Sequence, residues 1–390
     1  MLGDLPLVDH HCHSLLASWT RAGGGQWPAW RRCFTEATRQ AAPARDVPGL
    51  LGYRHFLGAV AELLAIAPGG EGHGGEDLER RVVAGRDELA GTDAAGYLRR
   101  LLGHAGTAAL LVDTGFEGER TLRPSELERA ADRPVHEIVR LEVLAGELLQ
   151  PGNPAGRSLS RFLGGFEERL GKALERGAVA VKSIAAYRGG LWLFRESGQA
   201  ARRRAFSGLD RAAQADRFED PVLLPFLVRR AAELAAARQV PLQFHTGFGD
   251  QDVYLPQADP ALLWPLLRDR RTEDCQVVLL HCYPFVGGAA YLAGTYPQVY
   301  MDLSLAIPLA EPIADRLVGE ALGLCPPGKL LAASDGHSYP EMHWWGATVW
   351  RRALARVLGA EVEAGGLDEP AARAVAKCIL ATNATRLYRL

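Results

Sequence analysis

Three of the chain's eleven histidines, His10, His11 and His13, lie within four positions near its start, in the segment PLVDHHCHSLL. The apolar run just before them, LPLV, predicts a short buried strand. Residues two apart on a strand point to the same face, so His11 and His13 should share a face and His10 should point the other way. Neutral imidazole is a ligand of borderline metals such as Zn²⁺ and Fe²⁺. A His-x-His pair alone is weak evidence for a metal site.

Four more residues with metal-binding or acid–base side chains lie inside or directly after apolar segments. Lys182 interrupts AVAVKSI, His245 ends VPLQFH, His281 ends QVVLLH, and Asp335 follows KLLAAS. If these segments are parallel strands of one barrel, their carboxyl ends meet on one face, where barrel active sites lie. The recurrence of metal-binding side chains at strand ends therefore predicts a metal site, which the His-x-His pair alone does not.

The elements that would position these residues alternate along the chain. Apolar, β-branched segments that predict strands lie at 5–9, 107–113, 134–142, 178–184, 240–245, 276–281, 298–303 and 329–334. Between them lie Ala-, Leu- and Arg-rich stretches of helical period, for example 56–67, 224–238 and 346–358. Eight such units predict an α/β fold with a closed (β/α)8 TIM barrel, and place His10 on its outside.

Two intervals are too long for a plain strand-to-strand crossover, 14–106 and 185–239. We interpret them as helical insertions after strands one and four that cover one mouth of the barrel. The expected organisation is a single barrel over residues 1–390, with 14–106 as a helical insertion or lid within it.

The composition narrows the classes of function. The chain has 390 residues, 48% hydrophobic and 23% charged, with a formal net charge of −2. This balance is typical of a soluble globular protein and gives no argument for nucleic acid or a membrane as partner. No apolar stretch approaches the roughly 18 residues of a transmembrane helix, and no secretory signal is evident, which favours a cytoplasmic location. The six cysteines form no CxxC pair and should be reduced thiols.

Lysine is rare in this chain: only four of the 44 basic residues are lysines, and Lys182 lies in an apolar segment. A buried ammonium is costly, and burial lowers the pKa of a lysine amine. The free amine can react with CO2 to give a carbamate, an oxygen ligand able to bridge two cations, whereas a guanidinium cannot. Alternatively, Lys182 stays charged and forms an ion pair or contacts the substrate.

Several segments taken together resemble the amidohydrolase superfamily of metal-dependent TIM-barrel hydrolases. Within it they resemble the amidohydrolase-2 or FluG-type branch, whose members occur alone or fused to glutamine-synthetase-like domains. The segments are VKSIAAYRGGL (181–191), FHTGFGDQD (244–252), LLHCYPFVGGAAYLAGTYPQVYMDLSLAIP (279–308), SDGHSYPE (334–341) and NATRLY (383–388). The likeness covers residues 5–388 and is weakest in 14–106.

The resemblance implies a set of metal ligands, which are His11, His13, Lys182, His245, His281 and Asp335. The first two would bind one divalent metal, expected to be zinc. A second ion would lie on the two later histidines, bridged to the first by a carbamylated lysine (N6-carboxylysine) at position 182; one ion or two is left open. Asp335 would be both ligand and catalytic general base towards the attacking water, whose pKa a divalent cation lowers.

The predicted activity is hydrolysis of a C–N (amide) bond by a metal-activated water, in a γ-glutamyl amide or a related small amido acid. Arg188 would hold the substrate carboxylate, and Tyr187 and His337 would line the substrate pocket. Two alternatives stay open: a decarboxylase, other lyase or isomerase on the same metal barrel, and a non-catalytic partner of a glutamine-synthetase-like ligase. The expected partner is a small-molecule substrate, and association into homo-oligomers stays open.

Overall fold

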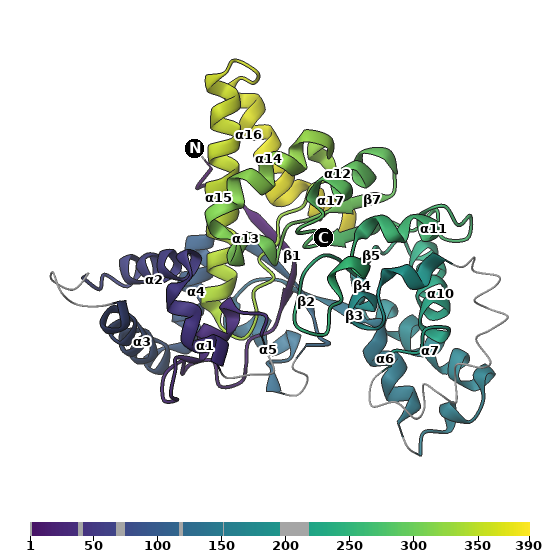
Figure 1. Cartoon of the computed structure of the whole chain (residues 1–390). Helices are drawn as coiled ribbons and strands as arrows, with labels where there is room; N and C mark the ends of the chain where they lie inside the picture. Colours follow the sequence, from purple (N-terminus) through teal and green to yellow (C-terminus); the bar gives the residue numbers. More distant parts are fainter. Residues whose placement is uncertain (1, 38–41, 68–74, 117–119, 151, 196–217) are drawn as a thin grey trace.

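Parallel strands in chain order form the centre of the molecule (Figure 1). The computed structural model describes residues 2–37, 42–67, 75–116, 120–150, 152–195 and 218–390. Its strands are β1 (Leu7–His13), β2 (Thr107–Asp113), β3 (Val135–Arg140), β4 (Ala180–Ser183), β5 (Leu242–His245), β6 (Val277–Leu280) and β7 (Val299–Met301). Each strand pairs in parallel with the next, from β1 to β7.

The segment 330–335 takes the eighth position, between β7 and β1. The Leu331 N–H donates to the carbonyl of Met301 at 3.0 Å, and a backbone hydrogen bond of 3.1 Å joins the far end of the segment to β1. Regular pairing is interrupted because the Ser334 N–H donates to the carboxylate of Asp9, at 2.9 Å, and not to a backbone carbonyl. The predicted (β/α)8 barrel is therefore confirmed, with an irregular eighth strand.

Helices surround the strands, most of them on the outside of the barrel (Figure 1). They are α1 (Ala42–Asp46), α2 (Leu51–Leu63), α3 (Gly75–Thr92), α4 (Ala94–Ala105), α5 (Pro124–Ala131), α6 (Leu141–Leu149), α7 (Leu159–Glu175), α10 (Leu223–Ala237), α11 (Trp264–Leu267), α12 (Val286–Thr295), α13 (Ala306–Leu309), α14 (Ala314–Leu324), α15 (Pro340–Glu363), α16 (Glu369–Lys377) and α17 (Asn383–Tyr388). The expected helix at 346–358 is the middle of the longer α15. No helix in the described part of the chain combines the length and apolar character that a bilayer crossing requires.

The first strand is longer than predicted and contains a bulge. The sequence predicted its end at Asp9, but β1 continues to His13, and its register against β2 shifts between Asp9 and Cys12. A bulge lets two consecutive residues point to the same side of a sheet. His10 and His11 both reach interior partners as a result, His10 contacting Tyr388 at 3.0 Å and His11 contacting Gln243 at 2.8 Å. The expectation that His10 lies outside the barrel is wrong, because strict alternation does not hold across a bulge.

The chain's last helix, α17, fills one end of the barrel. Its residues Ala384, Leu387 and Tyr388 belong to the same buried apolar cluster as inward residues early in the strands, such as Val8 and Val278. This end lies away from the strand carboxyl ends, where the predicted metal ligands are. The α17 helix therefore completes the barrel core at the end opposite the predicted metal ligands.

Both long intervals contain extra structure, as the sequence predicted. Helices α1, α2 and α3 occupy the interval after β1 and lie together on one side of the barrel in Figure 1. After β4 the described residues form two short 3₁₀ helices, η5 (Ala185–Tyr187) and η6 (Leu191–Arg195), before α10. The rest of that predicted insertion, 196–217, lies outside the described residues.

A buried ion pair joins the first insertion to the barrel. Arg86 on α3 donates to both carboxylate oxygens of Glu341 in the first turn of α15, at 2.6 and 3.3 Å, and Tyr97 on α4 donates to the same carboxylate at 2.8 Å. The side chains of Arg86 and Glu341 are fully buried. Removing Arg86 would take the neutralising charge away from the buried Glu341 carboxylate, to which the Tyr97 hydroxyl would still donate.

We expect Arg86→Ala to lower the free energy of unfolding by about 3–5 kcal/mol, the usual cost of breaking a buried ion pair. Urea unfolding of the purified variant measures this loss. The matched control is Arg80→Ala on the same helix, whose guanidinium is exposed and contacts Asp77 at 2.9 Å; it should change stability by no more than about 0.5 kcal/mol. Equal losses in the two variants would contradict the anchoring role of the buried pair.

Candidate metal centre

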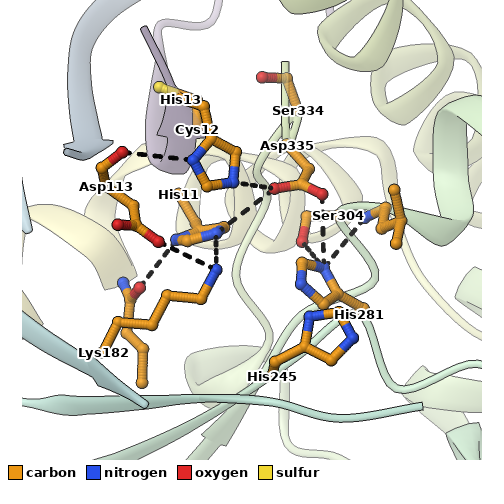
Figure 2. A network of polar contacts seen from close by, with 12 residues as sticks. His11, Cys12, His13, Asp113, Lys182, His245, His281, Ser304, Ser334 and Asp335 are labelled. Carbon is orange, nitrogen blue, oxygen red and sulfur yellow. Dashed lines mark hydrogen bonds and ion pairs between the residues drawn. The ribbon is translucent and has the colours of Figure 1, made fainter. Parts of the chain in front are cut away.

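The six predicted ligands come together in one buried cavity at the carboxyl ends of the strands (Figure 2). They are His11 and His13 on β1, Lys182 on β4, His245 at the end of β5, His281 directly after β6, and Asp335 at the end of the eighth segment. Their side chains point toward one another from five different strand positions, although they lie up to 324 residues apart in the sequence. The barrel arrangement predicted this convergence.

Asp335 lies at the centre of the group. Its Oδ1 atom is 3.4 Å from Nε2 of His11 and 3.4 Å from Nε2 of His13, and its Oδ2 atom is 3.9 Å from Nδ1 of His281. One ligand atom from each of His11, His13 and Asp335 lies within 4.8 Å of the other two. Oδ1 is buried without a hydrogen-bond partner among the described residues. An unpartnered carboxylate oxygen between two imidazoles is a site that a cation would stabilise.

Hydrogen bonds to obligate acceptors determine the tautomers of His11 and His13. Nδ1 of His11 is 2.8 Å from Oε1 of Gln243, and Nδ1 of His13 is 3.3 Å from the carbonyl oxygen of Asp113. A carbonyl oxygen can only accept, so both Nδ1 atoms carry the proton. In a neutral ring with this tautomer the lone pair is on Nε2, the nitrogen that faces Asp335. Such outer hydrogen bonds are how proteins orient metal-binding histidines.

The other two histidines form a second pair beside the first. The rings of His245 and His281 are 4.4 Å apart between centroids. Nε2 of His245 donates to the carbonyl oxygen of Phe248 at 3.0 Å, which leaves Nδ1 as its only available ligand atom. His281 has a left-handed backbone with φ of 70°, as does Asp335 with φ of 49°. Non-glycine residues rarely adopt this conformation, and it is concentrated at functional sites.

The protonation states of the cluster suit a cation. Burial lowers the pKa of His11 to about 4, and burial also lowers the pKa values of His245 and His281 well below the ordinary range. These imidazoles are therefore neutral at neutral pH. Burial alone would raise the pKa of Asp335, but the neighbouring His281 and His11 hold it well below its usual value, so the carboxylate is ionised.

Lys182 lies between the first histidine pair and a carboxylate that the sequence analysis did not single out. Its Nζ atom is 2.9 Å from Nε2 of His11 and 3.3 Å from Oδ2 of Asp113, and burial lowers the pKa of the amine. Asp113 also accepts from Arg140 at 2.6 Å. Asp113 ends β2 as His245 ends β5, so the strand-end rule could have identified it.

A pocket of about 380 Å³ opens above the ligands. The predicted substrate residues Tyr187, Arg188 and His337 line it, and Tyr187 packs on His245 with 4.4 Å between ring centroids. Further charged residues that the sequence analysis did not assign to substrate also line it: Arg32, Glu36, Arg140, Asp250 and Asp252. The pocket therefore carries both signs of charge. Arg32 and Glu36 come from the insertion after β1, where no sequence pattern marks them.

Comparison with known proteins agrees with this geometry. The family model for amidohydrolases matches residues 171–390, more than half of the chain. The chain belongs to the amidohydrolase family. Its resemblance to that superfamily, predicted from the motifs, is thereby confirmed, and a divalent metal is implied by the family and fits the donor set of His11, His13 and Asp335.

Individual relatives support the same assignment. This amidohydrolase is 30% identical to protein fluG of Emericella nidulans over 410 aligned positions; the match covers 99% of the chain but only 46% of fluG, so the chain spans about half the length of that relative. A protein of Lactobacillus casei ATCC 334 assigned as a metal-dependent hydrolase superposes with a TM-score of 0.84 at 28% identity, over 100% of this chain and 96% of the other. Uronate isomerase of Thermotoga maritima superposes with a TM-score of 0.67 at 15% identity, over 99% and 95%, a likeness of fold alone.

Proposed function

We propose that the protein is a metal-dependent hydrolase that cleaves the C–N bond of a small amido acid, with a γ-glutamyl amide as the model substrate. The observation that carries this proposal is the buried carboxylate oxygen of Asp335, which has no hydrogen-bond partner among the described residues and lies between the imidazoles of His11 and His13. His11, His13 and Asp335 would hold one divalent cation, zinc by its donor preference. His245, His281 and Lys182 would hold a second, with Lys182 as the carbamate formed when its amine nitrogen attacks CO2 and releases a proton.

A divalent cation bound there would acidify a water molecule and polarise a carbonyl group. The protein's own part is proton transfer by Asp335. Its carboxylate takes the proton from the water that attacks the amide carbon, and then delivers that proton to the leaving amine nitrogen. Tyr187, packed on His245, would fix the amide within reach of this carboxylate.

The two signs of charge in the pocket support an amino-acid-like substrate. Arg188 would hold a carboxylate, as guanidinium groups do with two parallel hydrogen bonds. Glu36 and Asp250, which line the same pocket, would accept a substrate ammonium. Since Glu36 belongs to the segment 14–106, that insertion would act as a lid that contributes to substrate binding.

A substrate panel tests this proposal. The zinc-loaded protein should release amine from γ-glutamyl amides faster than from neutral amides of equal size. Arg188→Ala should raise KM for the γ-glutamyl amide by roughly 10- to 100-fold, as expected for one charge-assisted hydrogen-bonding partner, with a smaller change in kcat. The matched control is Arg195→Ala, an exposed arginine on the same connection outside the pocket, which should leave KM unchanged.

Other results of these assays would favour one of the two alternative functions. Release of CO2 from acidic substrates, or interconversion of sugar acids without amine release, would favour the lyase or isomerase alternative on the same barrel. Absence of bound metal and of any turnover would favour a non-catalytic partner. An equal loss in both arginine variants would remove Arg188 from the substrate site.

A further inference from the structure

The C-terminal helix reaches the metal centre from the opposite end of the barrel. The Tyr388 side chain on α17 is buried, and its hydroxyl oxygen lies 2.8 Å from Nε2 of Gln243 and 3.0 Å from Nδ1 of His10. Gln243 is two residues before His245 on β5 and shares its inward face. Two hydrogen bonds, with Gln243 between them, therefore connect Tyr388 to His11.

Donor and acceptor rules fix the orientation of the Gln243 amide. Its nitrogen lies 3.2 Å from the backbone carbonyl of His10, which can only accept, so the NH2 group must be on that side. The second N–H of the amide donates to Tyr388. Oε1 is thereby directed at Nδ1 of His11, at 2.8 Å. A flipped amide would present N–H groups to Nδ1 and would force the His11 proton onto Nε2, the nitrogen that faces Asp335.

The hydroxyl proton of Tyr388 has a partner of its own. Because Tyr388 accepts from Gln243, its proton is directed at Nδ1 of His10, and the His10 proton then lies on Nε2, 2.9 Å from Oδ2 of Asp302. Oδ1 of Asp302 accepts from the backbone N–H of His281 at 2.5 Å. Tyr388 is therefore also connected, through His10 and Asp302, to the backbone of His281, another predicted ligand.

We propose that Tyr388 is a positioning residue of the metal centre: it holds the Gln243 amide so that His11 keeps its proton on Nδ1 and presents Nε2 to the metal. This role rests on the proposed function of His11 as a ligand. Partners outside the ligand shell commonly change metal affinity by about 10- to 100-fold when they are removed. Tyr388 acts one step further out, so we expect a weaker effect for it than for Gln243.

Zinc affinity, measured by competition with a chelator, tests the chain of contacts. Gln243→Leu should weaken zinc binding by roughly 10- to 100-fold and Tyr388→Phe by roughly 3- to 10-fold. In the Gln243→Leu background, Tyr388→Phe should cause no further loss, because its effect passes through the amide. The matched control is Tyr97→Phe, which removes a buried hydroxyl bonded to Glu341 outside the site and should leave zinc affinity unchanged.

A second measurement needs no metal. The ring ¹⁵N chemical shifts of His11 in metal-free protein should report an Nδ1-protonated ring in the wild type and in Tyr97→Phe. In Tyr388→Phe they should report a mixture of the two tautomers. A merely structural role for Tyr388 would lower stability without moving either the tautomer or the zinc affinity of the folded protein.

The outcomes separate this inference from the proposed function. If the wild type binds zinc and Tyr388→Phe binds it equally well with an unchanged tautomer, the positioning role is overturned. An undiminished effect of Tyr388→Phe in the Gln243→Leu background also overturns it, because the effect would then pass through His10. If the wild type binds no zinc, the proposed function fails, and the His11 tautomer in Tyr388→Phe still decides the role of the hydroxyl.

Discussion

Replacing Asp335 by asparagine is expected to lower the rate of amide hydrolysis by roughly 10²- to 10⁴-fold, the range associated with loss of a general acid–base group. The substitution keeps the size of the side chain but removes the ionised oxygen that lies 3.4 Å from both imidazoles of the first pair. An amide cannot take a proton from water and return it to the leaving nitrogen. It is also a poorer metal ligand than a carboxylate, so metal content should fall.

The measurement is steady-state hydrolysis at saturating zinc, with bound metal determined in the same samples. The matched control is Asp315→Asn, an exposed carboxylate that contacts Arg356 at 3.1 Å, which should retain full activity and metal. Full activity of Asp335→Asn would discard the mechanism. Loss of turnover with an intact cellular role would instead support the non-catalytic alternative.

Lys182→Ala should reduce turnover by roughly 100-fold or more, beyond the range of an outer-shell change, if the lysine carbamate bridges two cations. Short carboxylic acids such as acetate should restore part of the activity, because a free carboxylate can occupy the space of the lost carbamate. Lys182→Arg should be inactive and should resist this rescue, since a guanidinium fills the space and does not react with CO2. Rates with and without added acid, together with ¹³C NMR after labelled bicarbonate, provide the measurement.

The alternative, in which Lys182 is a charged ion-pair partner, predicts the opposite results. The amine is 3.3 Å from the Asp113 carboxylate, so it could remain an ammonium in an ion pair. In that case Lys182→Arg should keep substantial activity, and acetate should not help Lys182→Ala. The exposed Lys172, which contacts Glu168 on the surface, supplies the control variant Lys172→Ala, expected to behave as wild type with and without acid.

The parts of the site that follow strand periodicity could be predicted from the sequence. His245 and His281 end or directly follow buried strands, and barrel topology then requires them to meet His11 and His13. The eighth strand was located correctly by its apolar run, but its irregular pairing depends on Asp9 accepting from Ser334, 325 residues away. A local sequence pattern cannot indicate a contact between residues so far apart in the chain.

The errors and omissions have equally definite causes. His10 was misplaced because a bulge in β1 breaks the alternation on which the assignment relied. Gln243 carried a usable signal, since it is a polar residue at an inward strand position two before His245, but a neutral amide is neither a typical zinc ligand nor an acid–base group. Glu36 carried none: it lies in an insertion and reaches the pocket only through tertiary packing, where burial and the nearby Asp335 raise its pKa to about 7.

The α17 helix, which fills one end of the barrel, is synthesised after all six predicted metal ligands. His11 leaves the ribosome 377 residues before Tyr388 (388 − 11), a delay on the order of 20–75 s at roughly 5–20 residues per second. If Tyr388 positions His11 as proposed, His11 would present Nε2 to a metal only after α17 has docked, so metal binding would follow the folding of this helix into the barrel.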